Sequence, residues 1–503
     1  MKTTTVKSIG ASRLCTLVPS IVLVTATSIM LNGCSLNKLT ASSKDNSDLA
    51  VNVNSTKKAN VDKTITLAQV TKDVSYLASD ELKGRGNYSN DIRKAADYIA
   101  KRFNQVGLSS VTGIKNFKQT YTIQKVTPQT LTVQLNGKII SQEDLSIVTT
   151  QNHLNWQNIG TNEPLSTPPV NIVFIGENDD LRQSLSHLNH QGGEHLVLLH
   201  PTHKNTFTRY QGYFARGITK LMSSDTPTKD NKKTVNDGGS IVIALTAITK
   251  VEEFSVTSTS TVTSTALSNV VGVLPGKSKA HEIVLYSAHY DHLGVVPNIE
   301  GKASQPHHIY NGADDDASGV SAIINLAHHF SQVGNNERTL MFAAFSAEEI
   351  GGFGSRYFAK QIDANAITAM INIEMIGKPA VFGEGSVWMT GMERSNLGEQ
   401  LNEALASKKL TIYADPYPNQ NLFYRSDNAT LARLGVPAHS FSSTQLDKDQ
   451  HYHQVSDDIN SLHLPSLLKV IKTLAIATTP LVEGTVTPSR IDTNKVNRHG
   501  FIY

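Results

Sequence analysis

The stretch Glu282-Ile-Val-Leu-Tyr-Ser-Ala-His-Tyr-Asp-His-Leu-Gly294 decides the fold. Its apolar run, residues 283–288, has the length and residue types of a buried strand. The run ends abruptly at His289 and Asp291, which are poor core residues but suit a metal ligand and the group that orients it. Open α/β sheets bind ligands beyond the carboxyl ends of their strands. We therefore expect other strands of this sheet to end in metal-binding residues too.

Regular α/β alternation begins at residue 266 and defines a domain of residues 266–485, followed by a C-terminal tail, 486–503. Strands are expected at 269–274, 282–288, 339–345 and 366–373, and helices at 317–333, 354–362, 397–407 and 464–477. Near-continuous apolar strands that alternate with helices predict a mixed, largely parallel sheet with helices on both faces.

Two regions precede this pattern. Residues 64–120 are expected to be the N-terminal part of the same domain, with Arg85 between two glycines in a turn. Arg85 is then either an exposed turn residue or a buried member of an ion pair. Residues 121–265 contain short alternating runs separated by polar loops, which predict an inserted β-rich domain. The Thr/Ser run at 257–264 could serve as a linker.

The N-terminus has the pattern of a lipoprotein signal peptide, residues 1–33, with a positive region followed by an apolar run at 14–31. Leu31-Asn32-Gly33-Cys34 resembles the bacterial lipobox, whose cysteine is acylated after cleavage. A single membrane-spanning anchor is the alternative. Cys15 and Cys34 are the two cysteines of the chain, so cleavage would leave one and no internal disulfide.

Polar residues 34–63 predict a flexible tether after the lipid. Ser35, rather than Asp, follows the cysteine, which resembles the outer-membrane sorting signal of Gram-negative lipoproteins. We therefore expect a cell-envelope protein anchored through Cys34 and facing the periplasm; a periplasmic or secreted protein is the alternative. The formal charge is +3, and Lys2, Lys7 and Arg13 account for all of it. The remaining chain is about neutral, and nucleic acid is not an expected partner.

Further acidic and histidine residues fall at the expected strand ends and loops. They are Asp315 in a Gly-bounded acidic turn, Glu348 and Glu349 after the strand at 339–345, Glu374 after the strand at 366–373, and His453 in a polar loop before the last helix. Each group alone has an ordinary interpretation as a solvated turn, a first-turn acidic pair or a core histidine. Their joint occurrence at successive strand ends favours one site.

Such a set meets the needs of a hydrolytic site with two Zn²⁺ ions. Asp315 can bridge the metals, His289 and Glu374 can complete one, and Glu349 and His453 the other. Glu348, adjacent to a ligand but free of the metal, can act as the general base.

Five ordered motifs resemble the M28 family of co-catalytic zinc peptidases, which includes secreted bacterial leucyl-type aminopeptidases. They are Ser287-Ala-His-Tyr-Asp-His-Leu-Gly294, Asn311-Gly-Ala-Asp-Asp-Asp-Ala-Ser-Gly319, Phe345-Ser-Ala-Glu-Glu-Ile-Gly351, Glu374-Met-Ile-Gly377 and Tyr452-His453. The resemblance implies a phosphorylase/hydrolase-like α/β core and the same five zinc ligands. It also implies Glu348 as general base, Asp291 as the partner of His289 and a protease-associated-like insertion.

The chain departs from the family at two places. Many members have Asp where this chain has Glu374, and members often have His at the position of Asn428. Tyr424 lies where some relatives use a hydroxyl to stabilise the oxyanion; a place in the pocket wall or the core is the alternative.

We therefore expect a zinc-dependent exopeptidase, an aminopeptidase acting on peptides with a free N-terminus. A carboxypeptidase or glutaminyl cyclase on the same fold, or a non-catalytic peptidase-like binding protein, are the alternatives.

Overall fold

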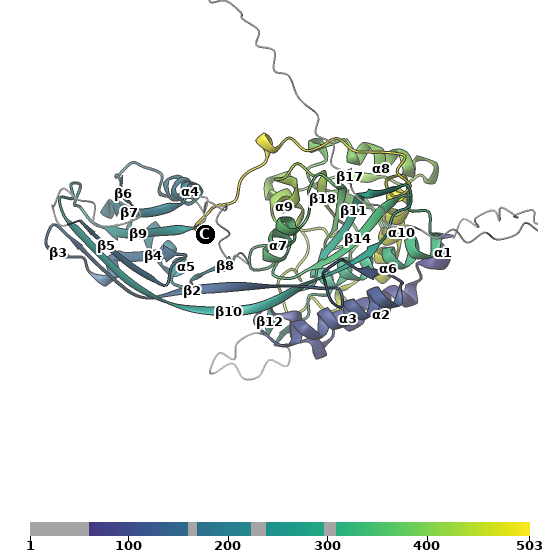
Figure 1. Cartoon of the computed structure of the whole chain (residues 1–503), viewed down its shortest axis with the longest axis horizontal. Helices are drawn as coiled ribbons and strands as arrows, with labels where there is room; N and C mark the ends of the chain where they lie inside the picture. The colour runs from purple at the N-terminus through teal and green to yellow at the C-terminus, as the bar shows by residue number, and fades with distance from the viewer. Residues whose placement is uncertain (1–59, 159–168, 223–237, 296–307) are drawn as a thin grey trace, which may run out of the picture. The chain divides into compact units, whose positions relative to one another are not determined.

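The computed structural model describes residues 60–158, 169–222, 238–295 and 308–503 (Figure 1). The expected signal peptide, Cys34 and the tether up to residue 59 lie outside the described residues. The tether was expected to reach residue 63, but helix α1, Val61–Thr64, begins earlier. The side chain of Asn60 accepts a hydrogen bond from the N–H of Asp62 at 2.9 Å and so caps this helix.

A twelve-stranded mixed sheet forms the main body of the chain. Its principal order is β17-β16-β18-β15-β11-β14-β10-β2-β3, with β1, β5 and β8 pairing at the side. The bounds are β1 Ser109–Ser110, β2 Lys118–Leu135, β3 Lys138–Ile139, β5 His153–Asn158, β8 Ile218–Leu221, β10 Phe254–Leu274, β11 Lys279–His289, β14 Arg338–Phe345, β15 Ile367–Ile373, β16 Val387–Met389, β17 Ile412–Ala414 and β18 Ala438–Ser442.

The centre of the sheet is parallel. Strand β11 pairs in parallel with β14 and β15, and β15 pairs in parallel with β18. Their carboxyl ends therefore share one edge, where His289, Phe345 and Ile373 are the last strand residues. This arrangement confirms the predicted mixed, largely parallel sheet.

Helices cover both faces of the sheet because β11 is apolar on both sides. Val284 and Tyr286 pack into a core shared with α2, α3, α6, α8 and α10, whereas Leu285 packs into a second core shared with α7 and α9. The bounds are α2 Leu67–Leu77, α3 Asp91–Gln105, α6 Gly319–Val333, α7 Phe353–Gln361, α8 Leu397–Leu405, α9 Asn428–Ala432 and α10 Leu464–Val482.

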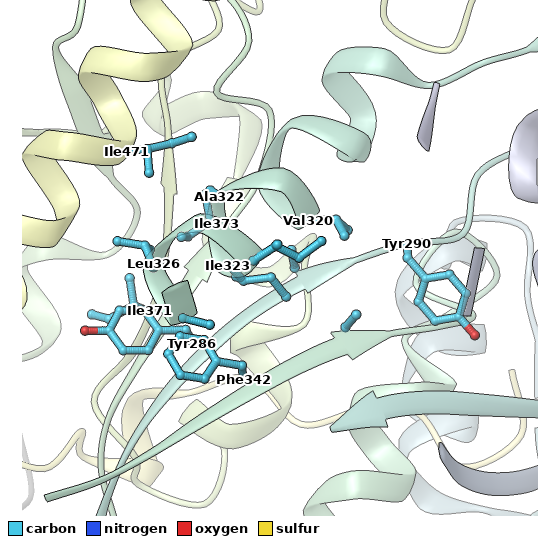
Figure 2. Close-up of a cluster of buried hydrophobic side chains, with 14 of the residues drawn as sticks. Tyr286, Tyr290, Val320, Ala322, Ile323, Leu326, Phe342, Ile371, Ile373 and Ile471 are labelled. Carbon is cyan, nitrogen blue, oxygen red and sulfur yellow. The ribbon is translucent and has the colours of Figure 1, made fainter. Parts of the chain in front are cut away.

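Figure 2 shows the first core around Tyr286. The Tyr286 ring stacks on Phe342 with centroids 5.1 Å apart, and Phe330 lies 5.8 Å away. Ile323 and Leu326 of α6 pack over the same strands (Figure 2). This packing fixes the strand that carries His289 beneath the helix that follows the acidic turn.

The inserted region is built on two long antiparallel strands. Strands β2 and β10 run side by side and continue from the main sheet into the insertion (Figure 1). The expected domain limits at 120/121 and 265/266 therefore fall inside continuous strands. The Thr/Ser run at 257–264 is not a linker but the middle of β10, paired with residues 124–132. Threonine is β-branched and favours the extended backbone of a strand.

A second sheet of order β4-β9-β7-β6 completes the insertion. It comprises β4 Leu145–Thr149, β6 Val170–Ile175, β7 Gly193–Leu199 and β9 Gly239–Leu245. The insertion is β-rich as expected, but it also has two helices that were not expected, α4 Leu181–Gln191 and α5 Lys204–Phe214. Leu181, Leu185 and Leu188 recur at helical spacing and are buried. That periodicity was the available signal for α4.

The C-terminal tail is ordered through its contacts. The carboxamide oxygen of Asn189, on α4, accepts hydrogen bonds from the N–H groups of Ile502 and Tyr503, both at 2.9 Å. Ile502 is buried in the core of the insertion. Helix α10 is long and apolar enough to cross a membrane, but 61% of its most apolar window is buried inside the protein.

Candidate metal centre

His289 ends β11 with its imidazole buried and 2% exposed. Its Nε2 lies 3.1 Å from Oδ1 of Asp315. Its Nδ1 lies 3.2 Å from the backbone carbonyl of Asp291 and 3.8 Å from the Asp291 carboxylate. Asp291 thus orients the ring mainly through its backbone.

The carboxylate of Asp291 acts on a different loop. It accepts hydrogen bonds from the N–H groups of Glu348 and Glu349, at 3.1 and 3.2 Å, and from the carboxamide of Asn87 at 2.6 Å. Asp291 therefore connects the loop after β11 with the loop after β14. The expectation that it orients His289 is met in part, and its larger role is to hold the two glutamates.

The acidic turn, Ala313–Ser318, divides its three aspartates between two roles. Asp314 accepts from the N–H of Gly377 at 2.7 Å. Asp316 accepts from the N–H groups of Met375 at 3.1 Å and Gly319 at 3.0 Å. Both carboxylates accept hydrogen bonds from backbone N–H groups and so hold the turn in place.

Asp315 is the aspartate that faces the histidines. Its Oδ2 lies 3.3 Å from Nε2 of His453, in addition to the contact of Oδ1 with His289. It is 3% exposed, and its backbone N–H is held by the carboxylate of Asp457 at 3.1 Å. Asp315 is therefore placed between two imidazoles.

Glu349 and His453 lie on the other side of Asp315. Oε2 of Glu349 lies 3.3 Å from Nε2 of His453, and Oε1 lies 2.6 Å from Nδ1 of His292. The carboxylate of Glu349 is 7% exposed, while His453 is 36% exposed. Ligand atoms of His292, Asp315 and Glu349 all lie within 4.8 Å of one another.

His292 was not among the expected site residues. It is the second histidine of His289-Tyr-Asp-His292, and its proximity to the first was the available signal. Its imidazole is buried, and its bond to Glu349 orients that carboxylate. His292 is thus a partner of a candidate ligand or a ligand itself.

Glu374 follows β15 and borders a cavity of about 90 Å³. Burial raises the pKa of Glu374 to about 7, and the positive charge of His289 opposes that rise. The cavity is lined by Met375, Trp388, Leu422, Arg425 and Tyr452, among others.

Glu348 carries the other carboxyl group of the adjacent pair. Burial raises the pKa of Glu348 well above its ordinary value, and the charge of His289 opposes this rise. The charges of Glu374 and Glu349 raise the pKa further. A raised pKa makes the carboxylate a stronger base, which favours its acceptance of a proton.

Tyr424 does not join this cluster. Its hydroxyl accepts a hydrogen bond from the N–H of Asn497 at 3.2 Å and lies 3.5 Å from the carbonyl of Lys495. Its ring lies 5.4 Å from the guanidinium of Arg394. Tyr424 therefore packs beneath the C-terminal tail, which corresponds to the alternative of a core position.

Tyr452 is the tyrosine that the structure brings to the site. Its ring stacks on the imidazole of His453 with centroids 3.9 Å apart, and its hydroxyl accepts from Arg425 at 3.1 Å. Burial raises the pKa of Tyr452, so the hydroxyl keeps its proton at neutral pH. Its position directly before His453 was the signal in the sequence.

The donor set fits a zinc site. Within the described residues, Nε2 of His289, His292 and His453 is buried without a hydrogen-bond partner, although His289 and His453 lie close to carboxylate oxygens. Buried polar atoms without partners are costly and rare in proteins. Imidazole nitrogens that face carboxylate oxygens are the ligands that Zn²⁺ takes. His289, Asp315, Glu349 and His453 can hold such an ion, with Glu374 at the border of the same site.

Comparisons with known proteins agree with this chemistry. The sequence model of peptidase family M28 matches residues 269–478. Leucine aminopeptidase 1 of Neurospora crassa is 25% identical over 289 residues, which are 55% of this chain and 66% of that protein. A probable zinc metalloprotease of Pyrenophora teres f. teres is 34% identical over 114 residues, 22% of this chain and 23% of that protein.

Among solved structures, the zinc aminopeptidase BSAP of Bacillus subtilis aligns with 86% of this chain and 99% of its own, with 16% identity and a TM-score of 0.47. The chain spans about two thirds of the length of the fungal leucine aminopeptidase and about a quarter of the metalloprotease.

The family match and the donor set define the class: a zinc-dependent exopeptidase, a hydrolase of peptide bonds. Residues 269–478 are similar to members of peptidase family M28.

Replacing Asp315 tests the metal centre. Asp315→Asn removes the charge that faces two imidazoles, so zinc affinity should fall by more than the about 10–100-fold that loss of an outer-shell partner costs. Elemental analysis after dialysis and competition with a chromophoric chelator measure this. His281→Ala, at an exposed histidine outside the cluster, is the control and should keep the zinc content of the wild type. Unchanged zinc affinity in Asp315→Asn would contradict the assignment.

Proposed function

We propose that this protein is an aminopeptidase that uses two Zn²⁺ ions to remove N-terminal residues from peptides. The observation that carries the proposal is the convergence of unpartnered histidine Nε2 atoms on Asp315 and Glu349, beside a cavity bordered by Glu374. The relatives named leucine aminopeptidase support the choice of substrate.

Asp315 would contribute to holding both ions. His289 and Glu374 would hold one of them, and Glu349 and His453 would hold the other. His292 sets the orientation of Glu349 through its bond of 2.6 Å. Bound zinc supplies a polarised carbonyl and a more acidic water molecule.

Glu348 is the proton carrier. Its backbone N–H is fixed by Asp291 at 3.1 Å, and the neighbouring Glu349 is fixed by the same carboxylate. One glutamate can therefore remain at the metal while the other takes the proton of the attacking water and delivers it to the leaving amine. The raised pKa of Glu348 favours the first step, in which it accepts the proton.

Tyr452 replaces Tyr424 as the candidate for stabilising the oxyanion. Its neutral hydroxyl is held by Arg425 next to His453 and Glu374. A fixed donor close to the reacting carbonyl stabilises the negative charge that develops in the transition state.

The cavity beside the metal centre bears on the choice between amino- and carboxypeptidase activity. Glu374 borders this cavity as well as the metal centre, so a substrate ammonium group bound there would lie beside a carboxylate, which favours an aminopeptidase. Arg425 lines the same cavity and could instead receive a carboxylate, which makes a carboxypeptidase the second candidate. The relatives' names favour the first.

A peptide panel decides between these activities. The zinc-loaded protein should release the first residue of free peptides and aminoacyl chromogenic substrates, and should leave N-blocked peptides intact. Chelation should abolish turnover and added zinc should restore it. Release of C-terminal residues from N-blocked peptides would replace the aminopeptidase assignment with the carboxypeptidase one, and no chelator-sensitive hydrolysis would refute both.

Glu348→Gln separates metal binding from chemistry. The change keeps the shape and removes the proton acceptor, so kcat should fall about 10²–10⁴-fold while zinc content stays at the wild-type level. Tyr452→Phe, measured in parallel, keeps the ring stack and should lower kcat with less effect on KM. Wild-type kcat in Glu348→Gln would remove Glu348 from the mechanism.

We also propose that the protein is anchored to the cell envelope through lipid on Cys34. The positive residues Lys2, Lys7 and Arg13, the apolar run at 14–31 and the lipobox-like Leu31-Asn32-Gly33-Cys34 support this. Several acyl chains together hold a protein firmly at a membrane.

Labelled palmitate should be incorporated into the wild-type protein and not into Cys34→Ser, and the variant should leave the membrane fraction. Cys15→Ser is the matched control and should be labelled like the wild type. Equal labelling of Cys34→Ser and the wild type would contradict the anchor.

A further inference from the structure

The turn that contains Arg85 packs against two loops of the metal centre, the loop after β11 and the loop that leads into the acidic turn. Lys83, Gly84 and Arg85 have φ values of +44°, +67° and +50°, a conformation that costs a non-glycine residue energy. A Cβ at Gly84 would lie 2.3 Å from the carbonyl oxygen of Tyr310 and 2.5 Å from that of Gly294. This turn is therefore in direct backbone contact with the segments after β11 and before the acidic turn.

The side chain of Arg85 is fully buried and bonds to carbonyl oxygens. Its Nε donates to Tyr290 at 2.7 Å. Its Nη1 donates to Leu77 at 2.5 Å and to Asn311 at 2.6 Å, and its Nη2 donates to Gly312 at 2.9 Å. The expected alternatives were an exposed residue or an ion pair, and the structure shows neither among the described residues.

The carbonyls that Arg85 binds are adjacent in the chain to candidate ligands. Tyr290 lies between His289 and Asp291, and Gly312 opens the turn that carries Asp315. These segments are far apart in sequence and come together at the guanidinium. A planar group with donors in a fixed fork imposes a set geometry on the acceptors around it.

Residues next to Arg85 in the chain also contact a third loop of the metal centre, the one after β14. The carboxamide of Asn87 donates to Asp291 at 2.6 Å and accepts from the N–H of Ala347 at 3.0 Å. The carboxylate of Asp80 accepts from the carboxamide of Asn311 at 2.8 Å. Residues 80–87 therefore contact all three loops that carry His289, Asp315 and the Glu348–Glu349 pair.

The positive charge of Arg85 is stabilised by the aspartates around it. Burial lowers the pKa of its guanidinium, and the charges of Asp315, Asp291 and Asp457 oppose that shift. Arginine retains its proton under such conditions, whereas a buried lysine loses it readily.

We propose that Arg85 is a positioning residue that sets the relative placement of the loops bearing His289 and Asp315, so that zinc affinity depends on it. The inference rests on the proposed function only in that zinc is the metal these loops hold. Arg85 touches neither substrate nor metal in this proposal, and it acts through the carbonyls of Tyr290, Asn311 and Gly312.

The experiment compares Arg85→Lys with Arg338→Lys in the full-length protein. Arg338 is the matched control because it is also fully buried and donates to backbone carbonyls, those of Leu481 at 2.9 Å and Val486 at 2.5 Å, but these lie at the end of α10 and in the tail. Zinc affinity by chelator competition, thermal unfolding of the metal-free protein, kcat and KM are measured for both.

Arg85→Lys should bind zinc about 10–100-fold more weakly than the wild type, and its kcat at saturating zinc should fall more than its KM changes. Arg338→Lys should lower the unfolding temperature of the metal-free protein and leave zinc affinity within a factor of about two. Equal zinc affinity in Arg85→Lys and wild type overturns the proposal, and so does an equal loss of affinity in both variants.

Asp80→Ala decides the matter if Arg85→Lys does not fold. Asp80 is exposed, and its loss frees Asn311 from one side while Arg85 stays in place. Zinc affinity should fall by up to about tenfold with the unfolding temperature of the metal-free protein unchanged. Unchanged affinity overturns the proposal. A wild-type protein that binds no zinc refutes the proposed function itself, an outcome distinct from loss of the Arg85 effect alone.

Discussion

The structure depends on burying several carboxylates at one edge of a parallel sheet. Asp291, Asp314 and Asp316 have no exposed surface. A buried carboxylate is costly unless hydrogen bonds or opposite charges compensate for its lost hydration. Here the compensation comes mainly from backbone N–H groups of neighbouring loops, such as those that Asp316 accepts from Met375 and Gly319. The hydrogen bonds that compensate these carboxylates therefore hold the loops together.

The hydrogen-bond partners divide these buried carboxylates into two groups, those that hold the loops together and those that face the histidines. Asp314, Asp316 and Asp291 are supplied with backbone donors. Asp315 and Glu349 instead face imidazole nitrogens, and the Nε2 atoms of His289 and His453 beside them have no hydrogen-bond partner among the described residues. A cation is the natural complement of such a set, because it satisfies the nitrogens and the carboxylates at once. That distribution of partners suits the chemistry of zinc peptidases, the class to which the matched family model belongs.

The regions outside the central sheet were harder to assign from the sequence. The residues of β10 include a Thr/Ser run whose composition is typical of linkers, yet they pair with β2 along the whole run. Pairing between segments more than a hundred residues apart is a tertiary property, and composition alone does not contain it. Helix α4 was also missed, although Leu181, Leu185 and Leu188 carry its periodicity, because the surrounding strand-like runs dominated the pattern.

The sequence by itself determined the parallel α/β core and the positions of His289, Asp315, Glu348, Glu349, Glu374 and His453 at strand ends and adjoining loops. It could do so because strand length, apolar continuity and the abrupt change to polar residues are local signals. Tertiary structure decided which residues complete the site. Tyr452 rather than Tyr424 faces the centre, His292 joins it, and Arg85 bonds to carbonyls from two of its loops. The physical reason is that a side chain's direction and its hydrogen-bond partners depend on loops brought together by the fold, and sequence spacing does not specify them.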